Sequence, residues 1–593
     1  MSKNSYYQQN VLTKKQTFKY WILVLLWIIS VGRLIIWWFS SGSYFINQMG
    51  FVLNSLVMGW VFIFPGWFYY YAGKMKTAKV SDESSPYPEG RIGLVVTKAP
   101  SEPWEMVKQT LIGMLNQDHP QEYDVWLADE NPDKETLTWC EQNSVNVSTR
   151  YGVEQYHNTA FPRRTKSKEG NLAFFYDKFG YDNYDFMCQF DADHIPESDY
   201  LTNIMLAFKD PTVGYVACPS ICDSNVNDSW LVRARLWVEA GMHGALQAGY
   251  SSVGMPFAIG SHYAVRVAAL KGLKHPINTR KGILGLLFQK FIIHIGGLGA
   301  ELAEDHVTSL AMVANGWKGA FSLNAIAHGD GADSFAASMQ QEFQWSRSLT
   351  QVLLSWTRGY FGLGFMGFYK KFHFLLGQLW YIFFSVTMLI GNLIPIVAVM
   401  SDKPIIKVDF LEFSLVTIPV TITALLPLLY LKKLQVLRPS NYDLVSVESL
   451  VFAYVRWPWA MWGVINGVIG SALGVQLAFK VTKKGSQEVK ALPFTTLVPY
   501  FVLIVLNAIT SLAFVPQKAA GYLYFTQLNA VVYSLAVFVI VLWHVKDNWR
   551  LGRITAVKSA ILPFIGLVST TILVVLTVLV KFPEALKVIM GLY

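Results

Sequence analysis

Two acidic residues at the end of an apolar run are the side chains of this chain best suited to chemistry. Phe186–Phe190 predicts a strand buried on both faces, and Asp191 and Asp193 follow it directly. Open α/β sheets place their ligands at the carboxyl ends of their strands. Two carboxylates there are suited to a hard divalent cation, Mg²⁺ or Mn²⁺. An isolated D-x-D is more often a solvated turn, so the metal assignment depends on what accompanies it.

Two further segments carry residues of the same chemical kind. Lys166–Asn171 places two ammonium groups beside Gly170 in a predicted polar loop, which suits close approach to a nucleotide. Glu304 and Asp305 precede apolar residues at helical spacing, which puts both acids at the amino end of a helix. These two acids either cap the helix or, in a more specific interpretation, provide a general base. A base needs partial burial here, because the helix dipole favours the ionised acid.

The elements that position these residues alternate between strand and helix. Ile92–Thr97 predicts a strand and Trp104–Asn116 a helix; the next strand, Val125–Ala128, ends at Asp129 and Glu130. With Phe186–Phe190 and a further strand at Val213–Cys218, the pattern predicts a Rossmann-like, mostly parallel sheet with helices on its faces. No G-x-G-x-x-G or P-loop motif follows the first strand, which argues against dinucleotide and P-loop chemistry.

The composition places part of the chain in a membrane. Its 593 residues are 53% hydrophobic, too long for one core and too apolar for a purely soluble protein. The first apolar window is too long, and too poor in small residues, for a removable signal peptide. Seven windows have the length and apolarity of a bilayer crossing: 20–39, 48–72, 372–400, 410–431, 492–514, 525–545 and 559–581.

The positions of the basic residues predict the orientation. Lys14, Lys15 and Lys19 precede the first window, whereas the loop after it has no Lys or Arg, so the amino terminus is expected in the cytoplasm. Two crossings return the large segment between about 75 and 370 to that side. The apolar stretch within 440–478 has basic residues on both flanks, which favours an interfacial helix. Lys and Arg on the cytoplasmic flanks of the membrane segments explain the net charge of +9, so nucleic-acid binding is not needed to account for it. The four cysteines are interpreted as core thiols.

The motifs together resemble the processive membrane members of glycosyltransferase family 2, the cellulose synthase and hyaluronan synthase type. Asp129, K-x-G-N at Lys168–Asn171 and D-x-D at Asp191–Asp193 follow the family's order. Phe257–Ser261 is similar to its F-F-C-G-S acceptor segment, which contains Gly260 and Ser261, and Ala303–Asp305 to its T-E-D. Gln341–Trp345 resembles Q-x-x-R-W. The gating-loop motif F-x-V-T-x-K-G matches at every fixed position, which include Phe479, Val481, Thr482 and Lys484.

The resemblance implies a role for each motif. Asp305 would be the catalytic base, and Asp191 and Asp193 would bind the metal. The donor would be held by Asp129, Lys168, Asp191 and Arg347, and the acceptor by Gln341, Trp345, Gly260 and Ser261. Arg347 enters because Gln344 replaces the family's Arg, and a neutral amide cannot supply that charge. Ala303 and Ile259 also depart from the family's residues and leave the sugar and the linkage open.

We therefore expect a glycosyltransferase-A domain at 76–348, inserted between an N-terminal transmembrane hairpin at 1–75 and a region at 349–593. That last region would hold interfacial helices at 349–370 and 440–478, a gating loop at 479–490 and the channel. The predicted protein polymerises a UDP-sugar, with UDP-glucose as the first choice, into a β-glucan-like polysaccharide in the plasma (inner) membrane and secretes it. Accessory export subunits or a homo-oligomer stay open. The alternatives are a single-addition transferase acting on a lipid carrier and an export pore with an inactive transferase domain.

Overall fold

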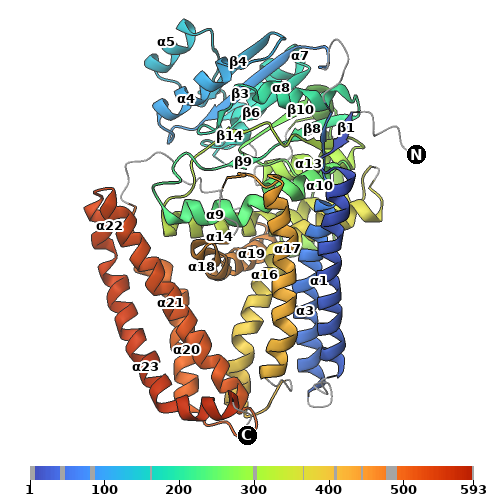
Figure 1. The fold of residues 1–593 in the computed structure, drawn as a ribbon. Coiled ribbons are helices and arrows are strands. Elements are labelled where there is room, and N and C mark those ends of the chain that lie inside the picture. Colours follow the sequence, from blue (N-terminus) through green and yellow to red (C-terminus); the bar gives the residue numbers. More distant parts are fainter. Residues whose placement is uncertain are drawn as a thin grey trace.

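The protein has a sheet domain on one side and a group of long helices on the other (Figure 1). The computed structural model describes residues 7–40, 47–79, 87–159, 163–297, 303–364, 366–405, 410–441, 445–475 and 490–589. The strands nearest the predicted site belong to the sheet domain, and the chain enters and leaves that domain through long helices.

The sheet domain is built on a seven-stranded sheet in the order β13-β8-β10-β6-β3-β4-β5. Neighbouring strands are parallel except at β10, which is antiparallel to both β6 and β8. The predicted mostly parallel sheet is therefore confirmed. Its strands are β3 (Ile92–Lys98), β4 (Tyr123–Asp129), β5 (Asn146–Ser148), β6 (Phe186–Phe190), β8 (Val213–Ala217), β10 (His262–Arg266) and β13 (Lys318–Phe321).

Alternating side chains divide the core between the two faces of this sheet. Leu94 and Cys188 point to the face covered by α4 (Trp104–Leu115), whereas Val95 and Met187 point to the other. That second face is covered by α6 (Lys168–Phe175) and α13 (Glu304–Ala314). All residues of β6 are buried, as expected for a central strand covered on both faces. The two helices that carry predicted site residues therefore lie on one face of the sheet.

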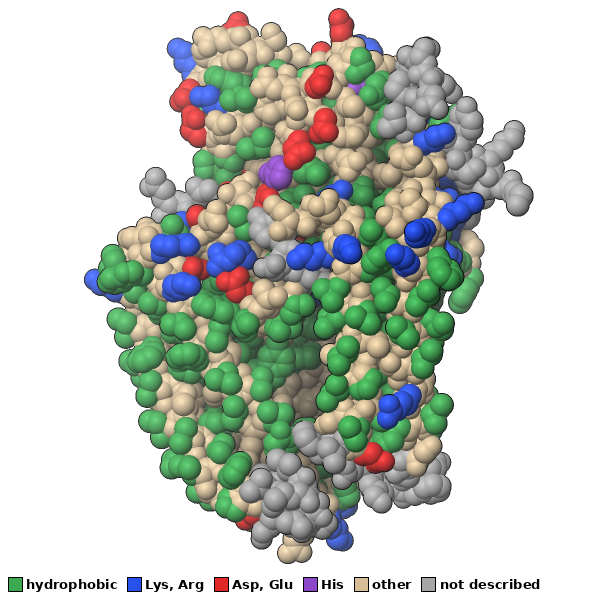
Figure 2. Space-filling view, in the orientation of Figure 1, with side chains coloured by type: hydrophobic (Ala, Val, Ile, Leu, Met, Phe, Trp, Pro, Cys, Tyr) green, Lys and Arg blue, Asp and Glu red, His purple; other side chains and the backbone are tan. Residues whose placement is uncertain are grey.

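Seven helical segments among the described residues are long and apolar enough to cross a membrane, in agreement with the seven predicted windows. Hydrophobic side chains cover the lower part of the molecule, which these helices form, and Lys and Arg gather in a band where it meets the sheet domain (Figure 2). The helices concerned are α1 (Lys14–Ser40), α3 (Gln48–Ala72), α16 (Phe368–Ser401), α17 (Phe410–Lys433), α20 (Phe494–Ala513), α21 (Ala520–Arg550) and α23 (Ile561–Ile589).

Contacts at the helix ends agree with alternate crossings. β1 (Gln8–Asn10) pairs antiparallel with β2 (Lys76–Ala78), so both ends of the α1–α3 hairpin meet beside the sheet domain. After α21, Arg553 forms ion pairs with Asp228 and Asp333 of the sheet domain at 3.5 and 3.7 Å. At the opposite end, Asp402 follows α16 and accepts hydrogen bonds from the backbone that precedes α21.

Three further helices connect the sheet domain to the long helices. α14 (Phe335–Val352) packs on α19 (Trp457–Leu473), where a Cβ on Gly463 would collide with Ser346. The predicted interfacial stretch 440–478 contains α18 (Val447–Val455) and α19, which begins at Trp457-Pro458 because proline is tolerated in a first helical turn. Within 349–370, which the structure describes except for residue 365, no separate helix covers the predicted interfacial segment. α14 continues to Val352, a π turn and α15 (Arg358–Tyr360) follow, and α16 begins at Phe368.

Candidate active site

Asp191 lies at the carboxyl end of β6, where the strand delivers it to the sheet edge. Its backbone N–H donates to the Ser261 carbonyl at 2.7 Å. The Lys168 ammonium donates to Asp191 Oδ1 at 2.7 Å and also to the Gly260 carbonyl. Burial disfavours the charged lysine, but the nearby carboxylates outweigh it and raise the pKa of Lys168. The structure thus joins the predicted D-x-D, K-x-G-N and acceptor segments through one half-buried cation.

Asp193 is a buried carboxylate with two donors. His194 Nδ1 lies 3.1 Å from Asp193 Oδ1, and the Asp330 backbone N–H donates to Oδ2 at 3.0 Å. Burial lowers the pKa of His194, but the Asp193 charge and hydrogen bond raise it to about 10 overall. His194 therefore carries a proton at neutral pH and serves Asp193 as a counter-charge. Ligand atoms of Asp191, Asp193 and His194 lie within 4.8 Å of one another, and the two carboxylates supply the hard oxygens that Mg²⁺ or Mn²⁺ prefers.

Asp305 lies in the first turn of α13, next to the same cluster. A Cβ on Gly260 would lie 3.2 Å from Asp305 Oδ2, so the glycine lets the loop approach the carboxyl. Burial raises the pKa of Asp305, although N–H groups of the His306 and Gly260 backbone and the charge of Lys168 act against it. Burial likewise raises the pKa of Glu304, to about 7. Asp305 is half-buried, so the partial burial that a base at this position requires is present.

The turn before α13 fixes the direction of these acids. Ala303 has a φ of 50°, in the left-handed region that non-glycine residues rarely occupy. Glu304 is held by the Tyr263 hydroxyl, which donates to its Oε1 at 3.0 Å from the neighbouring strand β10. The Ser261 hydroxyl, one residue before β10, is buried and has no hydrogen-bond partner among the described residues. A ligand hydroxyl is the kind of group that would satisfy it.

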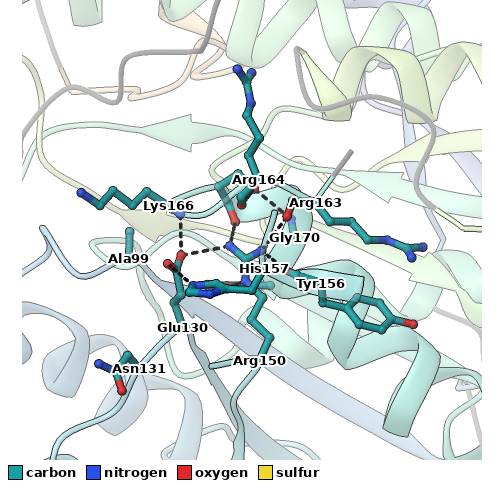
Figure 3. Close-up of polar contacts among 12 residues, drawn as sticks. Ala99, Glu130, Asn131, Arg150, Tyr156, His157, Arg163, Arg164, Lys166 and Gly170 are labelled. Atoms are coloured by element: carbon teal, nitrogen blue, oxygen red, sulfur yellow. Dashed lines mark hydrogen bonds and ion pairs between the residues drawn. The ribbon is translucent and has the colours of Figure 1, made fainter. Parts of the chain in front are cut away.

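Asp129 ends strand β4 and pairs with a lysine that no motif of the sequence indicated. Lys98, at the end of the adjacent strand β3, lies 2.9 Å from Asp129 Oδ2. Lys168, predicted to hold the donor together with Asp129, pairs with Asp191. The next residue, Glu130, accepts from His157 at 2.9 Å and from the Lys166 backbone at 2.5 Å (Figure 3). Lys98, Asp129, Glu130, His157 and Lys166 thus form a row of polar contacts, the polar wall, from the ends of β3 and β4 to the start of α6.

Arg150 is the centre of that wall and is almost fully buried. Its guanidinium lies 3.0 Å from Glu130 (Figure 3) and donates to Asn171 at 2.5 Å. It also explains Gly170, which was predicted to sit in a polar loop for close approach to a nucleotide. That prediction was wrong: Lys168–Phe175 is helical, capped by Ser167, and a Cβ on Gly170 would overlap the Arg150 guanidinium. The glycine makes room for the arginine.

The Q-x-x-x-W stretch lies on α14. Trp345 is half-buried, with the Arg235 guanidinium 4.8 Å from its ring centroid, and Gln341 has a buried carbonyl oxygen without a hydrogen-bond partner among the described residues. Arg347 donates to Gln344, the residue that replaces the family's Arg, at 2.6 Å. Burial lowers the pKa of Arg347, and the charge of Arg164 lowers it further. Two guanidinium groups close enough to repel are suited to an anionic ligand.

The gating-loop residues Phe479, Val481, Thr482 and Lys484 lie outside the described residues. Lys490, the last residue of the predicted loop, is described and forms an ion pair with Asp333 of the sheet domain at 3.1 Å. Of the cysteines, Cys140, Cys188 and Cys218 are buried core thiols as predicted, and Cys222 is half-buried 3.8 Å from His194 Nε2.

Comparison with known proteins finds one matching family model, which covers less than half of the chain. Residues 189–428 match the family described as Glycosyl transferase family group 2. No curated protein sequence matches the chain. The structure is similar to a mannosyltransferase, PcManGT, from Pyrobaculum calidifontis in complex with GDP-Man and Mn²⁺, at 12% identity and a TM-score of 0.40, covering 71% of this chain and 99% of that one.

Two further solved structures are similar over part of the chain. Glucosyl-3-phosphoglycerate synthase from Mycobacterium tuberculosis, with Mn²⁺, UDP and product, has 12% identity and a TM-score of 0.26, covering 44% of this chain and 78% of that one. TarS 1-349 from S. aureus in complex with UDP has 14% identity and a TM-score of 0.29, covering 56% and 89%. TM-scores below 0.5 do not carry the substrates of those proteins to this chain.

Proposed function

We propose that this nucleotide-sugar transferase, which carries a glycosyltransferase family 2 domain of the glycosyltransferase-A fold, is an inverting and processive enzyme. Its donor is a UDP-sugar, with UDP-glucose as the first candidate, and its product is a β-linked polysaccharide that leaves through its own membrane-spanning region. The observation that carries this proposal is the position of Asp305, a half-buried carboxyl next to Gly260 and to the Lys168–Asp191 pair.

The chemistry follows from that arrangement. Asp305 takes the proton of an acceptor hydroxyl as the hydroxyl oxygen bonds to the sugar C1, and the bond from C1 to the diphosphate breaks on the opposite face. UDP leaves with the bonding electrons, so the configuration at C1 inverts. A carboxyl with a raised pKa is a stronger base than an exposed one, and a positioned base typically contributes about 10²- to 10⁴-fold to the rate.

The leaving diphosphate needs compensating charge. Asp191 and Asp193 supply carboxylate oxygens for Mg²⁺ or Mn²⁺, which would neutralise charge developing on the diphosphate. Arg347 and Arg164 offer two guanidinium groups, and a bound anion would offset the repulsion between their charges. We assign Asp129 with Lys98, and the Glu130–Arg150 wall, to the nucleoside end of the donor.

The acceptor side and the export route follow from the elements around Trp345. The Gln341 amide oxygen can accept a hydrogen bond from a sugar hydroxyl, and the Ser261 hydroxyl can donate or accept one, since neither has a partner among the described residues; the Trp345 ring offers a flat face for a sugar. The gating motif at 479–485 and the five membrane-length segments that follow the sheet domain favour retention of the growing chain over release after one addition. The face in Figure 2 is hollowed between the long helices, as a polymer path requires.

The proposed orientation places the sheet domain in the cytoplasm. Basic residues gather where the sheet domain meets the apolar part of the molecule, and cytoplasmic flanks of membrane helices are rich in Lys and Arg (Figure 2). The proposed domains are the N-terminal hairpin at 1–75, the transferase domain at 76–348 and the helices and gating loop at 349–593. UDP-sugars, which cells make in the cytoplasm, would then reach the site directly.

Product analysis tests the proposal. The purified chain in lipid nanodiscs is given radiolabelled UDP-sugars one at a time with Mn²⁺ or Mg²⁺, and both UDP release and product length are measured. Long polymer digested by β-specific hydrolases is the expected product. One sugar on a lipid would identify the single-addition alternative, and no UDP release with any sugar would identify an inactive domain. Asp305→Asn should lose polymer formation while UDP binding persists.

A further inference from the structure

A hairpin of the sheet domain leaves an unusual number of large apolar side chains uncovered by the described residues. It consists of β11 (Lys274–Asn278), the short helix α12 (Gly282–Leu287) and β12 (Phe291–Ile295), and among the described strands β11 and β12 pair only with each other. A two-stranded ribbon is marginally stable in water, and exposed apolar patches mark interaction sites. The exposed residues, 37% to 66% accessible, are Ile277, Ile283, Leu284, Leu287, Phe288, Ile292, Ile293 and Ile295.

The hairpin is fastened to the helices that connect the sheet domain with the long helices. Gln289 donates to the Leu354 carbonyl at 3.1 Å, and Arg358 of α15 donates to the Leu286 carbonyl. Gly282 lies against the end of α19, where a Cβ would come 3.3 Å from the Ala472 carbonyl. The apolar hairpin is therefore held at the level of α19 and cannot swing freely away from it.

α19 itself presents an apolar stripe that runs toward this contact. Its glycines face α14, and the opposite side exposes Trp462, Ile465, Ile469 and Leu473, the last with 70% of its surface accessible. Because Gly282 contacts the chain at Leu473, the stripe of α19 continues into the exposed residues of the hairpin. One apolar surface thus extends from a helix at the junction with the long helices onto the sheet domain.

The charge of the hairpin identifies what covers this surface. Arg280, Lys281 and Lys290 are exposed beside the apolar residues, and residues 274–295 contain no acid. Anionic lipid headgroups attract such basic residues, while the apolar side chains suit the acyl boundary just below. A second copy of the chain docked on the same face would bring these cations together, which like-charge repulsion disfavours.

We infer that the β11–β12 hairpin is a membrane-inserted anchor. Its apolar residues enter the lipid leaflet on the side of the sheet domain, the cytoplasmic leaflet in the proposed orientation, and its basic residues meet anionic headgroups. This inference rests on the membrane-length segments and not on the proposed reaction. The hairpin leads along the chain toward α13, so the anchor would also set the height of Asp305 above the bilayer.

Depth-dependent fluorescence quenching tests the anchor on the full chain in nanodiscs that contain anionic lipid. An environment-sensitive fluorophore is attached at Leu284→Cys and, as a matched control, at Leu137→Cys on α5 (Lys134–Gln142), an exposed leucine of the sheet domain. Both positions are exposed, so neither label disturbs the core, and the unmodified chain gives the background from its own cysteines. Quenchers are lipids with a nitroxide on the acyl chain, and aqueous iodide.

We expect nitroxide lipids to quench the label at position 284 and not at 137, with loss of iodide quenching at 284 only. Equal iodide quenching at both positions would show a solvent-exposed hairpin and overturn the inference. Protection of position 284 from both quenchers would also overturn it, because protein would then cover the surface, either another copy or another part of the chain. A third label at Ile293→Cys should behave like that at 284, since both side chains belong to the same surface.

Discussion

Replacement of Arg150 by glutamine gives the most direct test of how this site is held together. Arg150 and Glu130 form an ion pair at 3.0 Å whose side chains are 1% and 5% exposed. The guanidinium also donates to Asn171 at 2.5 Å, to the Tyr156 carbonyl at 2.5 Å and to the Ser167 carbonyl at 3.2 Å. Arg150→Gln leaves the Glu130 charge buried without that partner and loosens the first turn of α6.

Removal of one partner of a buried ion pair costs about 3 to 5 kcal/mol. For a domain of this size, 1 kcal/mol shifts the melting temperature by about 2 to 4 °C, so Arg150→Gln should lower it by roughly 10 °C. Arg163→Gln is the matched control. Arg163 pairs with Asp177 at 3.4 Å with about a third of each side chain exposed, and such a surface pair contributes at most about 1 kcal/mol. Thermal unfolding of the solubilised chain, followed by tryptophan fluorescence, measures both.

The double variant Glu130→Gln/Arg150→Gln separates charge from packing. The double variant also removes the Glu130 carboxylate, which Arg150→Gln leaves without its arginine partner. It should therefore recover part of the stability that Arg150→Gln loses. Lys168 begins α6, so Arg150→Gln should also weaken UDP binding, which Arg163→Gln should leave unchanged. A melting temperature for Arg150→Gln equal to that of the control would refute the role given to this arginine, and an unrecovered double variant would refute the buried-charge explanation.

Three further outcomes follow from the site. Arg347→Ala should weaken UDP binding by about 10- to 100-fold, the value of a charge-assisted hydrogen bond, in equilibrium titrations where Gln344→Ala has a smaller effect; an unchanged affinity would remove Arg347 from the donor site. Tyr263→Phe removes a hydrogen bond that stabilises ionised Glu304, so the pKa of Glu304, followed by pH-difference infrared spectroscopy of its carboxyl band, should rise, and a fall would contradict this sign. Asp193→Asn should weaken Mn²⁺ binding by at least about tenfold in calorimetric titration, and retained affinity would place the metal elsewhere.

The sheet and the position of its acids could be predicted from the sequence because they depend on local patterns. The apolar run Phe186–Phe190 is the strand β6 to the residue, and α13 begins at Glu304 as the spacing of apolar residues indicated. The membrane-length segments could also be predicted, since about twenty consecutive apolar residues are compatible with few structures other than a membrane-spanning helix. These predictions needed only neighbours a few residues apart.

The partners of those acids could not be predicted, because they come from distant parts of the chain. Lys98 reaches Asp129 only because β3 and β4 are parallel neighbours. The helix at Lys168 was missed because Gly170 and Asn171 resemble a turn, whereas the Ser167 side chain caps the helix by accepting from the Gly170 N–H at 3.2 Å. A serine before charged residues was the available signal.

The arrangement of charge explains how one site can hold ionised acids beside a base of raised pKa. Lys168 directs its hydrogen bonds to Asp191 and the Gly260 carbonyl, and His194 is engaged with Asp193, so the two metal-ligand candidates each have a counter-charge. Asp305 has the charge of Lys168 only through space, and burial therefore decides its pKa. The diphosphate of a UDP-sugar carries two negative charges, which one divalent cation would balance, so burial would still decide the pKa of Asp305 when the donor is bound.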